Sequence, residues 1–216
     1  MMSDDNENWD IQSWDEKEES NTQDGIEITP DVMLKGRSMK AYIKNMETSY
    51  IRASELNKVS PPPKPGEQYR IITEKQFNAF SLILAVIEKQ IIEELWIAIY
   101  RINQPTVYAI IDMIEKGLIK KGGFVISNFF NQTKRPEVWA NVLLEYCESN
   151  PNFKHVYTHN HSKVVIMKIQ NNYYVMEGSG NMSDNARIEQ YLYENNKASF
   201  EFHKEWMNDV FEKSTK

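Results

Sequence analysis

Apolar residues recur along residues 67–216 in two alternating patterns: short runs of strand length, and longer stretches with helical spacing. The short runs predict strands over 69–73, 91–102, 123–130, 153–158, 163–169, 173–177 and 187–194. The spaced stretches predict helices over 77–90, 104–118, 135–150 and 198–211. Alternating strands and helices favour an α/β fold, a mixed β-sheet flanked by helices.

A different composition precedes this pattern. Apolar residues over 39–56 have helical spacing, and the proline-rich run SPPPKPG follows at 60–66. Consecutive prolines end a helix and favour a stiff, extended linker. We therefore predict a partly helical segment and a linker over 32–66, and a separate domain over 67–216.

The charge of the chain is unevenly distributed. The formal net charge is −6, but residues 1–31 contain eleven Asp or Glu and one Lys, which leaves +4 for the rest. Such a polar, acidic segment buries too little apolar surface to fold alone, so we predict a disordered tail over 1–31. Its tryptophans, Trp9 and Trp14, are either solvated or part of a segment that docks on a protein partner or covers the basic body.

A single cysteine, Cys147, excludes an internal disulfide and a cysteine-based zinc site. No segment has the pattern of a signal peptide, and no apolar run reaches the ~18 residues of a membrane span. These features predict a cytoplasmic protein without a membrane contact.

Candidate chemistry lies at the ends of two neighbouring predicted strands. The segment HSK at 161–163 begins one strand, and the turn GSGN at 178–181 ends the next. His161 and Lys163 are two residues apart, so their side chains share a face. An imidazole that titrates near neutral pH, an ammonium, and a turn rich in NH and hydroxyl donors suit the binding of a phosphoryl group without a metal.

The order of these two segments resembles the phospholipase D superfamily, whose members carry His-x-Lys, a hairpin and then Gly-Ser-x-Asn. The likeness covers residues 67–216 and is greatest to the single-motif members, bacterial nucleases among them, with similar domains in phage and mobile-element proteins. It implies that His161 attacks phosphorus, while Lys163, Ser179 and Asn181 hold the phosphate oxygens. It also implies a homodimer, in which a second His161 protonates the leaving oxygen and then activates water.

The resemblance further implies a carboxylate that orients His161, for which Glu189 is the first candidate and Glu194 the second. It implies no cofactor and no metal. One position departs from the family pattern, since Lys168 stands where the motif has an aspartate. The spacing from Lys163 to the turn is also longer than usual, which suggests a wide hairpin at 170–172.

Two other interpretations remain open. His155, His159 and His161 have the spacing of a metal cluster on one strand, although no carboxylate or cysteine lies nearby in sequence. A non-catalytic module is the second, in which the pocket holds phosphate or nothing and the acidic tail docks a protein partner. The favoured prediction is a metal-independent phosphodiesterase of the homodimeric type, with DNA or RNA as its substrate.

Overall fold

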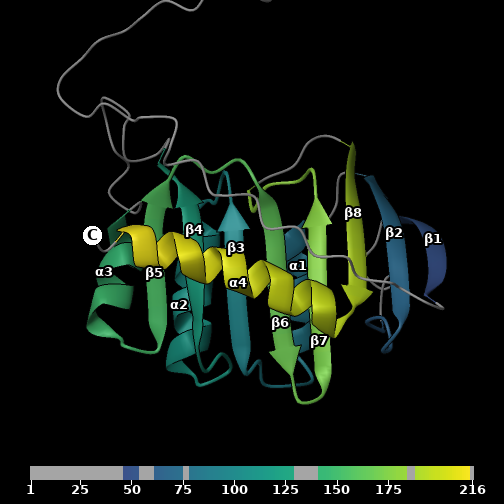
Figure 1. Ribbon diagram of the computed structural model, residues 1–216, viewed down its shortest axis with the longest axis horizontal. Coiled ribbons are helices and arrows are strands. Elements are labelled where there is room, and N and C mark those ends of the chain that lie inside the picture. Colours follow the sequence, from purple (N-terminus) through teal and green to yellow (C-terminus); the bar gives the residue numbers. More distant parts are fainter. Residues whose placement is uncertain (1–45, 54–60, 75–77, 129–140, 184–187, 215–216) are drawn as a thin grey trace, which may run out of the picture. The chain divides into compact units, whose positions relative to one another are not determined.

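The computed structural model describes residues 46–53, 61–74, 78–128, 141–183 and 188–214, all within the unit Met39–Lys216. They form a mixed eight-stranded sheet with four helices, in the strand order β1-β2-β8-β7-β6-β3-β4-β5 (Figure 1). The predicted α/β fold class is therefore confirmed. The strands are β1 Glu47–Ala53, β2 Glu67–Glu74, β3 Glu94–Ile99, β4 Gly122–Ser127, β5 Phe153–Thr158, β6 Lys163–Ile169, β7 Asn172–Gly178 and β8 Ile188–Asn195. The helices are α1 Ala79–Ile87, α2 Gln104–Glu115, α3 Val142–Ser149 and α4 Lys197–Ser214.

Strands β2 to β8 and all four helices lie where the pattern predicts them, with shifts of a few residues at their ends. Parts of three predicted elements, 129–130, 135–140 and 187, lie outside the described residues. So do the predicted tail over 1–31 and residues 32–45. None of the described helices is long and apolar enough to cross a membrane.

The predicted helix over 39–56 is wrong for residues 47–53, which form β1. This strand pairs in parallel with β2, from Glu47 opposite Glu67 to Ala53 opposite Thr73. The proline-rich segment between β1 and β2 contacts the sheet, since Asn195 Nδ2 on β8 donates to the carbonyl of Pro63 at 3.1 Å. Pairing at the sheet edge therefore overrides the helical spacing of the apolar residues, and the segment before the prolines contributes a strand to the same sheet.

Two apolar layers cover the sheet. Helices α1, α2 and α3 pack with Ile97, Met167 and Tyr193 on one face, while α4 packs with Trp96 and Ile166 on the other. Figure 1 shows α4 running across five neighbouring strands, which are β5, β4, β3, β6 and β7. Strands β3 and β4 are buried along their whole length, as expected of parallel strands at the centre of an α/β sheet.

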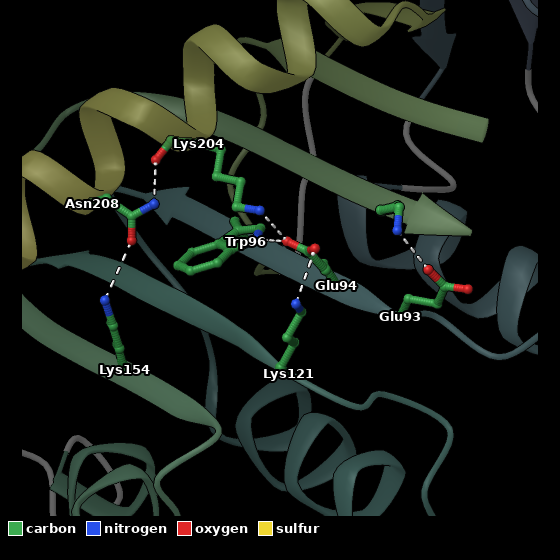
Figure 2. Close-up of polar contacts among 8 residues, drawn as sticks. Glu93, Glu94, Trp96, Lys121, Lys154, Lys204 and Asn208 are labelled. Atoms are coloured by element: carbon green, nitrogen blue, oxygen red, sulfur yellow. Dashed lines mark hydrogen bonds and ion pairs between the residues drawn. The ribbon is translucent and has the colours of Figure 1, made fainter. Parts of the chain in front are cut away.

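A buried carboxylate fastens α4 to the sheet (Figure 2). Glu94 on β3 is 5% exposed and accepts from Lys204 of α4 at 2.6 Å, from Lys121 at 3.2 Å and from Trp96 Nε1 at 3.1 Å. Burial tends to raise the pKa of Glu94, but the hydrogen bonds from Lys204 and Trp96 hold it below its usual value. The carboxylate thus stays charged under the helix.

Candidate active site

The two halves of the predicted motif meet where several strands of the sheet begin or end, at the top of Figure 1. These strand ends are called the catalytic edge below, as distinct from the edge strands β1 and β5. Strands β3 and β7 end there and the antiparallel strands β6 and β8 begin there, with Lys163 opposite Ile99 and Gly178 opposite Tyr191. Helices α1 and α2 also begin at this edge, because each directly follows the end of β2 or β3 along the chain. The fold therefore collects side chains from four strands at one end of the sheet.

His161 and Lys163 lie together, as their spacing predicts. Lys163 Nζ donates to the carbonyl oxygen of His161 at 3.0 Å and lies 3.4 Å from His161 Nδ1. The His161 ring lies against Tyr100, with 4.6 Å between ring centroids, and Lys163 Nζ lies 5.4 Å from the Tyr100 ring centroid. Tyr100, which follows β3, thus supports both groups, while His161 stays exposed to solvent.

Ser179 and Glu189 form the second part of the site. Ser179 N donates to the carbonyl of Gln190 at 3.0 Å, and Gln190 N donates back to Ser179 Oγ at 3.0 Å. The Ser179 hydroxyl donates to Glu189 Oε2 and so fixes the direction of that carboxylate. Beyond the last paired residues of β7 and β8, the Ser179 hydroxyl accepts the bond from Gln190 N. This bond keeps Ser179 and Glu189 next to each other at the ends of these strands.

Charge connects the two parts. Partial burial lowers the pKa of Lys163, and the negative charge of Glu189 opposes this shift. Glu189 therefore lies close enough for its charge to act on Lys163. Among the described residues, however, no hydrogen bond joins Glu189 to His161, so the predicted orienting contact is absent from this arrangement.

Asn181 holds the turn to the end of β3. Its side-chain oxygen accepts from the backbone NH of Arg101 at 3.0 Å, and the next residue, Met182, pairs with Ile102. On the other side, the N-cap residue of α1, Asn78, donates to the carbonyl of Ser183 at 3.1 Å. The predicted turn is therefore anchored between the starts of α1 and α2.

Two further positions lie away from these strand ends: Lys168, which stands where the motif has an aspartate, and Glu194, the second candidate for the carboxylate that orients His161. Lys168 is five residues after Lys163, about 16 Å along the strand, and its side chain alternates to the opposite face. There it pairs with Glu93 at 2.8 Å. Glu194 likewise lies five residues along β8 from Glu189 and is buried beside Val175 on the α4 face. Neither residue lies at the site.

The wide hairpin suggested by the spacing is wrong. Ile169 pairs with Asn172, so that Gln170 and Asn171 alone form the turn, with Gln170 at φ 52°. The extra residues between the two half-motifs lengthen the strands instead.

The three histidines of the metal interpretation have different surroundings. His155 lies within β5, where burial lowers its pKa to about 4, whereas His159 lies 3.4 Å from Asn128. His161 contacts Tyr100 and Lys163. In the described part of the chain, no three His, Cys, Asp or Glu side chains are spaced to hold a metal ion.

Sequence reasoning missed a histidine–carboxylate pair on the face covered by α4. His203 Nε2 lies 2.9 Å from Glu177 Oε1, and Trp206 Nε1 donates to His203 Nδ1 at 3.0 Å. An indole can only donate, so Nδ1 accepts and Nε2 carries the proton toward Glu177. The signal in the sequence is the spacing of three residues between His203 and Trp206 on a predicted helix.

Comparisons with known proteins identify the fold only. No protein-family model and no curated protein matches the chain. Among solved structures, a polyphosphate kinase from Porphyromonas gingivalis matches at a TM-score of 0.50 and 14% identity, over 67% of this chain and 26% of that chain. This likeness shows that the two chains share the α/β arrangement over that part of their length.

Two further structures match at lower TM-scores. The archaeal chromatin protein TrmBL2 matches at 0.44 and 14% identity, over 68% of this chain and 52% of its own. A phosphatidylserine synthase from Haemophilus influenzae Rd KW20 matches at 0.43 and 13% identity, over 66% and 38%. The chain thus spans between about a quarter and a half of the structures it matches.

Proposed function

We propose that this protein is a metal-independent phosphodiesterase, a nuclease that works as a homodimer through a phosphohistidine. The observation that carries the proposal is the meeting of His161 and Lys163 with Ser179 and Glu189 at one edge of the sheet. The phospholipase D-like fold supports a phosphodiesterase-type activity, and the choice of a nucleic acid follows from the single-motif resemblance.

The first step uses His161 as the nucleophile. In the resting arrangement the Lys163 ammonium lies at Nδ1, which places the ring proton on Nε2. An arriving phosphate would draw Lys163 to its oxygens. The exposed ring of His161 can then exchange protons with solvent, losing the one on Nε2 and gaining one on Nδ1, so that Nε2 can attack phosphorus. The P–O bond to the leaving group breaks as the N–P bond forms, and Lys163, Asn181 and Ser179 stabilise the charge on the phosphoryl oxygens.

The second histidine comes from a second copy of the chain. A leaving oxygen needs a proton, and the described part of the chain offers one His-x-Lys pair. The His161 of the other copy would donate that proton, then take one from a water molecule that attacks phosphorus. Hydrolysis of the N–P bond returns the first His161 to its starting state. Both copies must therefore present the same edge to one phosphodiester.

The deciding experiment is cleavage of single- and double-stranded DNA and RNA in EDTA. We expect the unmodified protein to cleave, and His161→Ala to lose activity by a factor of about a thousand. His159→Ala is the matched control, because it removes an exposed histidine two residues away that contacts Asn128 instead. Activity that survives His161→Ala, or that requires a divalent metal, contradicts the proposal. A lack of cleavage by any of these proteins favours the non-catalytic module.

Subunit mixing tests the dimer. Unmodified and His161→Ala chains would be mixed in equal amounts and allowed to exchange subunits. If one site needs a histidine from each copy, about a quarter of the unmodified activity remains; if each chain acts alone, about half remains. The second result would contradict the two-histidine site without contradicting the chemistry at His161.

A further inference from the structure

Arg101 lies at the catalytic edge, where the two halves of the motif meet. It directly follows Tyr100, whose ring lies against the ring of His161, with 4.6 Å between centroids, and 5.4 Å from Lys163 Nζ. The backbone NH of Arg101 donates to Asn181 Oδ1 at 3.0 Å. Arg101 therefore follows a residue that contacts the proposed nucleophile, and itself contacts a proposed phosphate-binding residue.

Backbone hydrogen bonds fix the position of Arg101. Met182 N donates to the carbonyl of Arg101 at 3.0 Å, and Asn103 N donates to the carbonyl of Met182 at 3.1 Å. Ile102, between them, is buried and pairs with Met182. These bonds use main-chain atoms of Arg101 and leave out its side chain. A substitution at Arg101 can therefore remove the guanidinium without releasing the turn.

The guanidinium of Arg101 is available to a ligand. The residue is exposed, and among the described residues no group forms a hydrogen bond or ion pair with its guanidinium. Other cations of the domain have carboxylate partners, as Lys168 has in Glu93 and Lys204 has in Glu94. The first turn of α2, which follows Arg101 in the chain, contains no acidic residue. A guanidinium suits a phosphate, because its planar set of donors matches the phosphate oxygens.

The two cations of the catalytic edge approach the site from different strands. Lys163 begins β6 and lies 3.4 Å from His161 Nδ1, so it is the cation of the scissile phosphate. Arg101 follows β3 and is joined to the site through Asn181. Its long side chain can extend beyond the phosphate that Asn181 would hold. Two cations at separate positions fit two successive phosphates of one strand, whereas a small diester has only one.

We infer that Arg101 binds the phosphate next to the scissile phosphate, and so makes the site selective for polynucleotides over small phosphodiesters. The inference rests on the proposed function and names its substrate class, a strand with at least two successive phosphates. Arg101 determines specificity in this role and takes no part in breaking the P–O bond. Its loss should therefore weaken the use of a strand far more than the hydrolysis of a single diester.

Two labelled thymidine oligonucleotides that differ by one phosphate test the inference in EDTA. The dinucleotide contains the scissile phosphate alone, whereas the trinucleotide adds a neighbouring one. We expect Arg101→Gln to lower kcat/KM for the trinucleotide about tenfold, and for the dinucleotide by at most about twofold. Arg101→Lys keeps the charge and should recover part of the loss. Arg70→Gln is the matched control, because it also removes an exposed guanidinium, but from β2, and should change neither value.

Binding is measured separately from cleavage, on a His161→Ala background. Fluorescence anisotropy follows a labelled single strand of about 12 nucleotides in EDTA at several salt concentrations. Arg101→Gln should reduce the slope of log affinity against log salt by about 0.7, which corresponds to one phosphate contact on a single strand. Arg70→Gln should leave the slope unchanged.

Equal losses on the dinucleotide and the trinucleotide would overturn the inference, and so would no loss on either or an unchanged salt slope. If the unmodified protein cleaves neither substrate, the binding measurement decides alone. A slope that depends on Arg101 without cleavage contradicts the nuclease and keeps the phosphate contact. Cleavage that is independent of Arg101 on both substrates keeps the nuclease and removes Arg101 from substrate recognition.

Discussion

His203 and His161 lie in opposite kinds of surroundings. His203 is 8% exposed under α4, with one ring nitrogen at Glu177 and the other at Trp206. His161 lies exposed at the sheet edge, with Lys163 and the ring of Tyr100 as its contacts. The histidine whose two ring nitrogens both have partners inside the protein is thus the buried one.

The difference separates stability from chemistry. A histidine whose two nitrogens are both bonded inside the protein has one tautomer and contributes to packing. A histidine that attacks phosphorus through Nε2 needs its other nitrogen, Nδ1, to lose its partner when substrate arrives, so that Nδ1 can carry the ring proton. Lys163 is suitable as that partner, because a phosphate attracts its ammonium more strongly than a neutral imidazole does. Variants on the two sides of the sheet should therefore change different quantities.

The largest effect is expected for the exposed His161, and it should be an effect on activity. His161→Ala should reduce cleavage about a thousandfold while changing the free energy of unfolding by less than about 0.5 kcal/mol, because an exposed side chain is removed. Parallel urea denaturation and kinetic measurements on one preparation check this. A loss of stability comparable to the loss of activity would show that His161 supports the fold.

Substitutions on the face covered by α4 should change the free energy of unfolding. Glu94→Gln removes the charge that pairs with Lys204 and Lys121 under α4, and should lower the free energy of unfolding by about 3 kcal/mol. Asp112→Asn is the matched control, since its pair with Lys116 is exposed and should contribute less than about 0.5 kcal/mol. Equal effects of the two variants in denaturant titrations would disprove the anchoring role of Glu94.

Lys163→Gln should reduce kcat about a hundredfold, because it removes the cation from the phosphoryl oxygens. Lys168→Gln should leave kcat unchanged, since Lys168 lies at the other end of β6 and pairs with Glu93. Steady-state cleavage in EDTA distinguishes the two. Loss of activity in Lys168→Gln would mean that this end of the strand influences the site.

The smallest effect is expected at His203. His203→Gln should destabilise the fold by about 1–2 kcal/mol and leave cleavage per folded molecule intact. The hydrogen bond from His203 lowers the pKa of Glu177 below 4.5, so the pair stabilises the fold above that pH and its contribution is lost as pH falls through the folded value. Thermal melts between pH 6 and pH 3 should therefore show a smaller acid slope in the variant; an identical slope would contradict this.

Periodicity predicts most of the fold because most elements bury one face. Strands β3 and β4 are buried along their whole length and consist mainly of apolar residues, and α2 begins after the Asn103 cap with Pro105 in its first turn, so local sequence and tertiary packing agree. Periodicity fails at β1, where it predicts a helix. Its Tyr50 is exposed and Ile51 half-buried, so its sequence carries little burial signal, and pairing with β2 decides its conformation.

The candidate site was predictable where residues are close in sequence. The two-residue spacing of His161 and Lys163 fixes their shared face, and the structure places them in contact. The contact of Ser179 with Glu189 depends on the register of β7 against β8, which no local pattern specifies. The same holds for the support from Tyr100 and for the pair of Glu177 with His203, which join distant segments.

The tight turn at Gln170 and Asn171 has a consequence for how the length of this domain can vary. A hairpin closed by two residues grows or shrinks at its tip, one residue on each strand, while Val164 stays opposite Glu177 at the other end. The number of residues between Lys163 and Ser179 then changes in steps of two without moving either side chain. That number measures how far the hairpin projects beyond the opposite ends of the neighbouring strands, and chains with different intervals can hold Lys163 and Ser179 in the same arrangement.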